Sequence, residues 1–232
     1  MWIGGFQKLT LLDYPGQVAC IVFTAGCNFR CPFCHNGELV TGADEVRPVA
    51  EEEVFAYLEK RRGILDGLVL SGGEPLLQPD AEDFIRRVRA LGYLVKLDTN
   101  GSFPDRLEWL LQERLLDYVA MDIKASPARY GDVVGRDAGD ILPRVRRSAA
   151  LLRESGVSHE FRTTLVKGLH REAEIPEIAA WISGEESYYL QSYKESEGVL
   201  APDGLGCFSL EELQRMLTAA RKICPGARLR GE

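Results

Sequence analysis

Short apolar runs alternate with amphipathic segments along most of the chain. Runs of strand length cover residues 18–23, 68–71, 94–99, 118–123, 158–165 and 188–191. Segments with apolar residues at helical spacing lie at 51–62, 80–91, 104–115, 140–155, 175–182 and 210–223. Strands that alternate with helices in this way pair in parallel and are covered by the helices, so the pattern predicts an α/β fold.

Residues typical of helix ends support several of these boundaries. Asp80 stands where a capping residue is expected, and Pro104 stands at the first helical position, where proline is tolerated. Gly92 and Gly156 follow the ends of two predicted helices. Residues 127–140 are rich in glycine and aspartate, and we expect this stretch to be a loop.

Six strand–helix units are fewer than the eight of a complete TIM barrel. The pattern is compatible with an open barrel and with a doubly wound sheet, and both folds place their chemistry at the carboxyl ends of the strands. We expect one domain over residues 1–232, with an N-terminal extension at 1–17, a core at 18–192 and a C-terminal segment at 193–232.

Composition narrows the classes of function. The formal net charge is −7, whereas nucleic-acid-binding proteins usually carry a basic face, so we expect no nucleic-acid partner. No run reaches the ~18 apolar residues that span a bilayer, and the N-terminus lacks the pattern of a signal peptide. We therefore expect a cytosolic protein with no membrane partner. In a reducing cytosol, the six cysteines are expected to serve metal binding or catalysis rather than disulfides.

The main candidate site is the segment Cys27-Asn28-Phe29-Arg30-Cys31-Pro32-Phe33-Cys34, which directly follows the first predicted strand. Three thiolates on one loop can converge on one metal centre, and iron–sulfur clusters are usually held by four. With three protein ligands, one iron of a cubane stays open for a substrate or cofactor. The alternative is a structural zinc site, which usually needs four ligands. The candidates for its fourth ligand are His35, Cys20, Cys207 and Cys224.

Polar segments follow or end the next three predicted strands. They are Ser71-Gly72-Gly73-Glu74-Pro75, Asp98-Thr99-Asn100-Gly101 and Asp122-Ile123-Lys124. Each segment alone is also compatible with a turn or a cap. Together, however, the charged groups surround one mouth of the sheet, where Lys124 can pair with a carboxylate. Arg162, in the fifth predicted strand, faces the same mouth or bonds to a neighbouring acid.

The spacing Cys-x3-Cys-x2-Cys, with aromatic Phe33 before the last cysteine, resembles the signature of the radical S-adenosylmethionine (SAM) superfamily. The resemblance implies a partial (β/α)6 TIM-like barrel and a [4Fe–4S] cluster held by Cys27, Cys31 and Cys34. It also implies that the open iron chelates SAM and that one electron cleaves the sulfonium bond. The resulting 5′-deoxyadenosyl radical then removes hydrogen from a substrate. By the same resemblance, Phe33 packs near the adenine of SAM.

The strand-end segments resemble the SAM-binding motifs of this superfamily, in particular those of pyruvate formate-lyase activating enzyme. By this resemblance Gly72-Gly73-Glu74 and Asp98 hold the amino group of SAM, and Lys124 or Arg162 faces its carboxylate. The residues expected to help hold a monovalent cation beside that carboxylate are Asp98, Thr99 and Asp122.

The N-terminal run from Gly4 to Gly16, with the segments 23–28 and 35–36, resembles the anaerobic ribonucleoside-triphosphate reductase activating proteins. That implies an enzyme that makes a glycyl radical in a partner protein. The expected partner is an anaerobic ribonucleotide reductase, and the expected electron donor is a flavodoxin or a ferredoxin. Two alternatives stay open. One is a radical SAM enzyme acting on a small molecule, such as a carboxy-deazaguanine synthase, and the other is a non-catalytic metal-binding module.

Overall fold

An eight-stranded sheet forms the centre of the computed structural model, which describes residues 1–41, 47–182 and 187–231. The strands lie side by side in chain order. Their bounds are β1 Ile3–Thr10, β2 Ala19–Thr24, β3 Gly67–Gly72, β4 Leu94–Thr99, β5 Tyr118–Asp122, β6 Ser158–Leu165, β7 Tyr188–Ser192 and β8 Arg228–Arg230. The first two strands are antiparallel, and every later pair is parallel.

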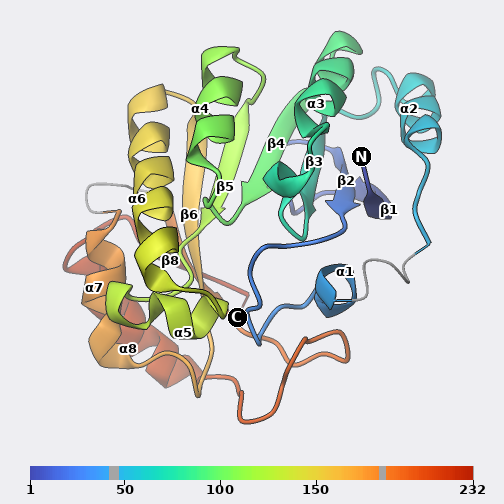
Figure 1. The fold of residues 1–232 in the computed structure, drawn as a ribbon. Helices are drawn as coiled ribbons and strands as arrows, with labels where there is room; N and C mark the ends of the chain where they lie inside the picture. Colours follow the sequence, from blue (N-terminus) through green and yellow to red (C-terminus); the bar gives the residue numbers. More distant parts are fainter. Residues whose placement is uncertain (42–46, 183–186, 232) are drawn as a thin grey trace.

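Helices connect the strands and pack along the outside of the curved sheet (Figure 1). Their bounds are α1 Gly37–Thr41, α2 Glu51–Lys60, α3 Ala81–Ala90, α4 Pro104–Gln112, α5 Tyr130–Val134, α6 Ala138–Ser155, α7 Ile175–Ala180 and α8 Leu210–Arg221. Among the described residues no ladder joins β1 to β8, so the sheet is an open barrel rather than a closed one. In this part of the chain no helix has both the length and the apolar composition needed to cross a membrane.

The predicted α/β fold with a partial barrel is confirmed, and all six predicted strands are present. The two edge strands were missed. In β1 three consecutive residues, Gln7, Lys8 and Leu9, are exposed, so burial does not alternate with a period of two, and β8 has only three residues. Neither strand therefore carries the apolar alternation that identifies a strand in a sequence.

Two local predictions are wrong. Residues 127–140 do not form a simple loop, because they contain α5 and the first turn of α6, which the side chain of Asp137 caps by accepting from the N–H of Gly139. Asp80 does precede α3, but its side chain makes no capping hydrogen bond. The end of α6 at Gly156 is as predicted, with a φ of 72°.

The two faces of the sheet differ in chemistry. Side chains on the outer face, such as Val22 and Leu70, join the main core under the helices. On the inner face, Ile21, Val69 and Tyr14 form a second, smaller apolar cluster at the beginnings of the strands. Further along the strands the inner face becomes polar, and this change places charged groups toward the carboxyl ends.

A buried carboxylate ties the far edge of the sheet together. Glu160 on β6 is 1% exposed and accepts two hydrogen bonds from Arg230 on β8, at 2.7 and 2.8 Å, and one from the hydroxyl of Tyr118 on β5, at 3.1 Å. Burial alone would raise the pKa of Glu160, but the bonds from Arg230 outweigh burial and lower the pKa.

We predict that Glu160→Gln destabilises the fold by about 1–2 kcal/mol at pH 7, because a charged bidentate pair is lost but Arg230 is partly solvated. The folded-state pKa of Glu160 lies below that of the unfolded chain, about 4.3, so this stabilisation is present above that pH and is lost as the pH falls through the folded pKa. Urea unfolding at pH 7 and in acid measures the difference. The exposed Glu154→Gln is the control, and an equal effect of both variants would contradict the assignment.

Candidate active site

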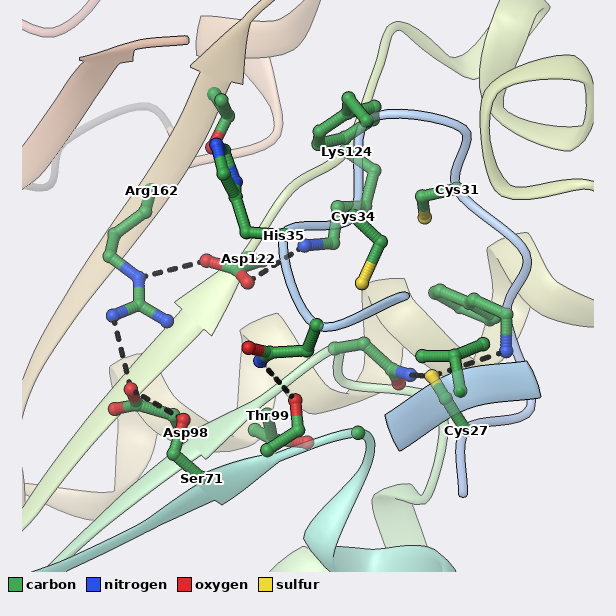
Figure 2. Close-up of a pocket in the computed structure, with 18 of the residues that line it drawn as sticks. Cys27, Cys31, Cys34, His35, Ser71, Asp98, Thr99, Asp122, Lys124 and Arg162 are labelled. Carbon is green, nitrogen blue, oxygen red and sulfur yellow. Dashed lines mark hydrogen bonds and ion pairs between the residues drawn. The ribbon is translucent and has the colours of Figure 1, made fainter. Parts of the chain in front are cut away.

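The three clustered cysteines face one cavity at the carboxyl ends of the parallel strands. Its volume is about 400 Å³, within the range of small-molecule sites. Figure 2 shows the sulfur atoms of Cys27, Cys31 and Cys34 directed toward a common space. Of the predicted site residues, those that line the cavity are Cys27, Cys31, Phe33, Cys34, Gly72, Gly73, Asp98, Thr99, Asp122, Lys124 and Arg162.

The cysteine loop is held in place by the backbone of the segment after β3. The N–H of Gly73 donates to the carbonyl of Thr24, and the N–H of Glu74 donates to the carbonyl of Gly26, both at 2.9 Å. A side-chain Cβ at Gly73 would lie 1.9 Å from the carbonyl oxygen of Gly26, and Gly72 has a φ of 115°. These two glycines are therefore required for contact between two strand-end loops, a reason that the sequence alone did not reveal.

Burial raises the pKa of two of the three cysteine thiols. Cys31 is buried, and Cys27 is partly buried. Burial raises the pKa of the Cys27 thiol to about 11 and that of Cys31 to about 12, so both thiols are protonated at neutral pH unless a metal replaces the proton. The N–H of Phe29 donates to the sulfur of Cys27 at 3.4 Å, as amides do around metal-bound thiolates.

The donor set and the space fit a cluster with three protein thiolates. Within the described ranges, no three His, Cys, Asp or Glu side chains are close enough to hold a single metal ion. The three thiols instead surround a cavity that accommodates a larger group. None of the predicted zinc ligands Cys20, Cys207 and Cys224 lines this cavity, whereas His35 does. The ring of His35 hydrogen bonds to the carbonyl oxygen of Lys194 at 2.7 Å.

A chain of alternating charges crosses the inner face of the sheet beside the cavity. Lys96 pairs with Asp98, which lies 3.4 Å from Arg162. Arg162 donates to Asp122 at 2.8 Å, and Lys124 donates to the other oxygen of Asp122 at 2.8 Å. Figure 2 shows the part from Asp98 through Arg162 to Asp122. The three cations exceed the two carboxylates by one positive charge.

These contacts keep Asp98, Asp122 and Lys124 ionised. Burial alone would raise the pKa values of Asp98 and Asp122, but Arg162 and the neighbouring lysines lower both. Burial would lower the pKa of Lys124, yet Asp122 raises it. Arg162 thus bonds to neighbouring acids, which was one of its two predicted roles.

Lys124 is also positioned by aromatic neighbours. Its ammonium nitrogen lies 5.8 Å from the ring centre of Phe33. The ring of His170 lies 6.2 Å from that of Phe33 and bonds to the carbonyl of Lys124 at 2.8 Å. Phe33 is only 4% exposed and forms one wall of the cavity.

Glu74 does not line the cavity. It is fully buried, and its carboxylate accepts from the hydroxyl of Thr99 at 2.8 Å, from the N–H of Asn100 at 2.7 Å and from the N–H of Leu76 at 3.1 Å. Burial raises its pKa to about 7 despite these donors. In this geometry Glu74 holds the end of β4 against the loop after β3, and its contact with the amino group of SAM stays a prediction.

The predicted cation-binding oxygens already have partners. Asp98 and Asp122 are paired with the cations described above, and the hydroxyl of Thr99 is bonded to Glu74. The monovalent cation also stays a prediction.

The sequence interpretation missed several residues of the site. Lys96 is 2% exposed, and the period of two along β4 places it on the same face as Asp98, a signal that could have identified it. Asp13 from the N-terminal extension and Thr164 from β6 line the cavity without any local motif. Their contribution depends on how the chain folds.

Comparison with known proteins decides the family. Residues 21–182 match the profile of the radical SAM superfamily, and this stretch includes the three cysteines and the whole charge chain. This chain belongs to the radical SAM superfamily. A [4Fe–4S] cluster and SAM are the cofactors of the family, and Cys27, Cys31 and Cys34 are the group of thiols that fits such a cluster here.

Three curated relatives of this radical SAM enzyme carry names of two kinds. A suspected glycyl-radical enzyme activating enzyme of Methanocaldococcus jannaschii is 32% identical, over 84% of this chain and 81% of its own length. A 7-carboxy-7-deazaguanine synthase of Methanopyrus kandleri is 30% identical, over 91% of this chain and 85% of its own length. A pyruvate formate-lyase-activating enzyme of Listeria monocytogenes is 33% identical, over 51% of both chains.

Among solved structures, a radical SAM methyltransferase from Sphaerobacter thermophilus has the same fold. The TM-score is 0.70 at 20% identity, over 96% of this chain and 68% of the other.

We predict that Gly73→Ala prevents cluster assembly, because the added methyl group would overlap the backbone of Gly26 and push the cysteine loop away. After anaerobic reconstitution, iron analysis should give about four irons per native chain and well under one for the variant. Gly206→Ala, whose methyl group would meet only an ordinary contact at 4.0 Å, serves as the control. Full iron loading of Gly73→Ala would contradict this role.

Proposed function

We propose that this enzyme activates a glycyl radical enzyme, with an anaerobic ribonucleotide reductase as the partner. The cluster, once reduced by one electron, supplies the cleavage of the C5′–S bond of SAM, which yields methionine and a 5′-deoxyadenosyl radical. That radical takes a hydrogen atom from one glycine Cα of the partner, giving 5′-deoxyadenosine and a glycyl radical. The observation that carries the proposal is that three thiols and the two cations Lys124 and Arg162 face the same cavity.

The protein groups have separate tasks in this proposal. Cys27, Cys31 and Cys34 hold the cluster and leave one iron open. The cations Lys124 and Arg162 line the cavity, and the carboxylate of SAM pairs with one of them there. Phe33 provides an apolar wall for the adenine.

Further contacts complete the SAM site. We propose that the backbone carbonyls of Gly72 and Gly73 and the carboxylate of Asp98 accept hydrogen bonds from the amino group of SAM. Glu74 lies behind this backbone and completes the group. Three of these residues, Gly72, Gly73 and Asp98, line the cavity, and carbonyl and carboxylate oxygens are acceptors. We propose that a monovalent cation, where one binds, takes its oxygen ligands from Asp98, Thr99 and Asp122. These oxygens would then give up the hydrogen bonds and ion pairs described above.

We further propose that residues 1–232 act as one domain.

An exposed apolar surface beside the cavity supports a protein partner. Leu9, Leu11 and Leu12 are 54%, 66% and 91% exposed, and Asp13, the next residue, lines the cavity. Exposed apolar side chains grouped in one short segment are typical of a surface that another protein covers. The M. jannaschii relative and the Listeria enzyme point in the same direction.

One observation favours a second function. The Methanopyrus kandleri relative extends over nearly the whole chain and is named for a small-molecule product. Under this alternative the same cavity holds a small substrate, and turnover needs no partner protein.

Cleavage of SAM tests the shared part of both functions. We predict that the reconstituted chain, reduced with dithionite under anaerobic conditions, forms 5′-deoxyadenosine from SAM. Cys31→Ala should lower the rate by at least about a hundredfold, because a cluster ligand is lost. Cys207→Ala, an exposed cysteine outside the cavity, should retain the native rate. A native protein with a full cluster that does not cleave SAM would refute the proposal.

Formation of a glycyl radical in the partner protein tests the identity of that partner. We predict that incubation with an anaerobic ribonucleotide reductase gives a glycyl signal in electron paramagnetic resonance. The double variant Leu11→Ser/Leu12→Ser should lower that signal about tenfold, a loss consistent with two buried apolar side chains at an interface. SAM cleavage without the partner is the internal reference, and Leu210→Ser, another half-exposed leucine, is the control. No glycyl signal, together with turnover of a small substrate alone, would favour the second function.

A further inference from the structure

Two arginines lie on the outer side of the cysteine loop. Arg30 donates to the carbonyl oxygens of Cys27 at 2.5 Å and Phe29 at 2.8 Å, and Arg136 donates to the carbonyl oxygen of Asn28 at 2.5 Å. Both side chains are exposed. Neither forms an ion pair with any residue that the structure describes, so each guanidinium presents its charge and its remaining N–H groups to solvent.

The turn after α5 brings these two arginines together. The N–H of Arg30 donates to the carbonyl of Val134 at 2.8 Å. Gly135 ends α5 with a φ of 64°, and a Cβ there would lie 3.1 Å from the Cβ of Arg30. The tight packing leads the chain directly to Arg136, beside the cysteine loop, and Figure 1 shows α5 next to that loop.

The acidic residues nearby in the sequence do not neutralise this pair. Two of them are in ion pairs with arginines of their own segments, and the third caps the N-terminus of α6. These three residues are Asp132, Asp140 and Asp137. Within the described part of the chain, Arg30 and Arg136 thus have no ion-pair partner, while the formal net charge of the whole sequence is −7.

We propose that Arg30 and Arg136 form the docking point for a small acidic protein that carries a one-electron flavin or iron–sulfur centre. This inference rests on the proposed function, in which the cluster must gain one electron. In that step the donor loses one electron, the cluster gains it, and no atom is transferred. An acidic donor is repelled by the chain as a whole, so a local cationic pair directs it to the loop that carries the cluster ligands.

Binding provides the first test and does not depend on activity. The double variant Arg30→Gln/Arg136→Gln loses two charges but keeps hydrogen-bond donors for the loop carbonyls. We expect the cluster-loaded variant to bind an oxidised flavodoxin and an oxidised plant-type ferredoxin about tenfold more weakly than the native protein at low ionic strength. The difference should disappear in 0.5 M salt, where screening is strong.

The matched control is Lys60→Gln/Arg62→Gln, which removes the same charge from exposed residues at the end of α2, near the start of β3 and away from the cluster loop. This control should bind both donors like the native protein. If only one donor loses affinity in the arginine variant, that donor is the class that docks here. Native affinity of the arginine variant for both donors would overturn the proposal.

A second test compares two sources of the electron. The rate of SAM cleavage with the protein donor, divided by the rate with dithionite, should fall about tenfold in the arginine variant and stay unchanged in the control. A change in loop geometry alone would lower both rates equally, and an unchanged ratio would overturn the proposal. If the native protein fails to cleave SAM even with dithionite, the proposed function fails, while the binding measurement still decides the docking proposal.

Discussion

The backbone contact between Gly73 and the loop after β2 determines where the three cysteines lie. A parallel sheet brings the carboxyl ends of its strands together, but it does not set the position of an irregular loop that leaves one of them. Here the N–H groups of Gly73 and Glu74 bond to carbonyl oxygens on the cysteine side, and no side chain fits between the two backbones. On the opposite side of the loop, Val134 and Arg136 bond to it from the α5 turn. The thiols are therefore presented by a segment fixed from two directions.

Charge balance is the second constraint on the site. Five charged side chains share a largely buried space, and each pairs with a neighbour of opposite sign. Burial of single charges would cost several kcal/mol each, so the alternation is what permits charged groups at this depth. Two of the cations, Lys124 and Arg162, line the cavity, where a ligand with a carboxylate can pair with them. Glu74 supports the arrangement from behind by holding Thr99 and Asn100 at the end of β4.

Much of this organisation could be predicted from the sequence. The apolar runs located all six inner strands, and the carboxyl-end rule collected Gly72, Asp98, Asp122 and Lys124 around one mouth before any contact was known. The cysteine spacing indicated the family. These successes share one cause, because each depends on local periodicity or on a motif within a few residues.

The features that the sequence did not predict depend on contacts between distant segments. The strand β1 has three consecutive exposed residues, and α5 has only five residues, with glycine at its second position, so neither shows a clear period. The hydrogen bonds that Glu74 accepts from Thr99 and Asn100 likewise join segments that are distant in the sequence, and its motif does not reveal them. Asp13, between β1 and β2, lines the cavity together with residues distant in the sequence, and no local pattern predicts this.

The central claim is that Cys27, Cys31 and Cys34 hold a cluster whose open iron binds SAM in this cavity. The most direct measurement is electron–nuclear double resonance on the reduced cluster with SAM labelled with ¹⁵N at its amino group. We expect a hyperfine coupling between that nitrogen and the cluster, and this coupling should be absent when SAM is omitted. A reduced cluster with SAM present and no such coupling would contradict it.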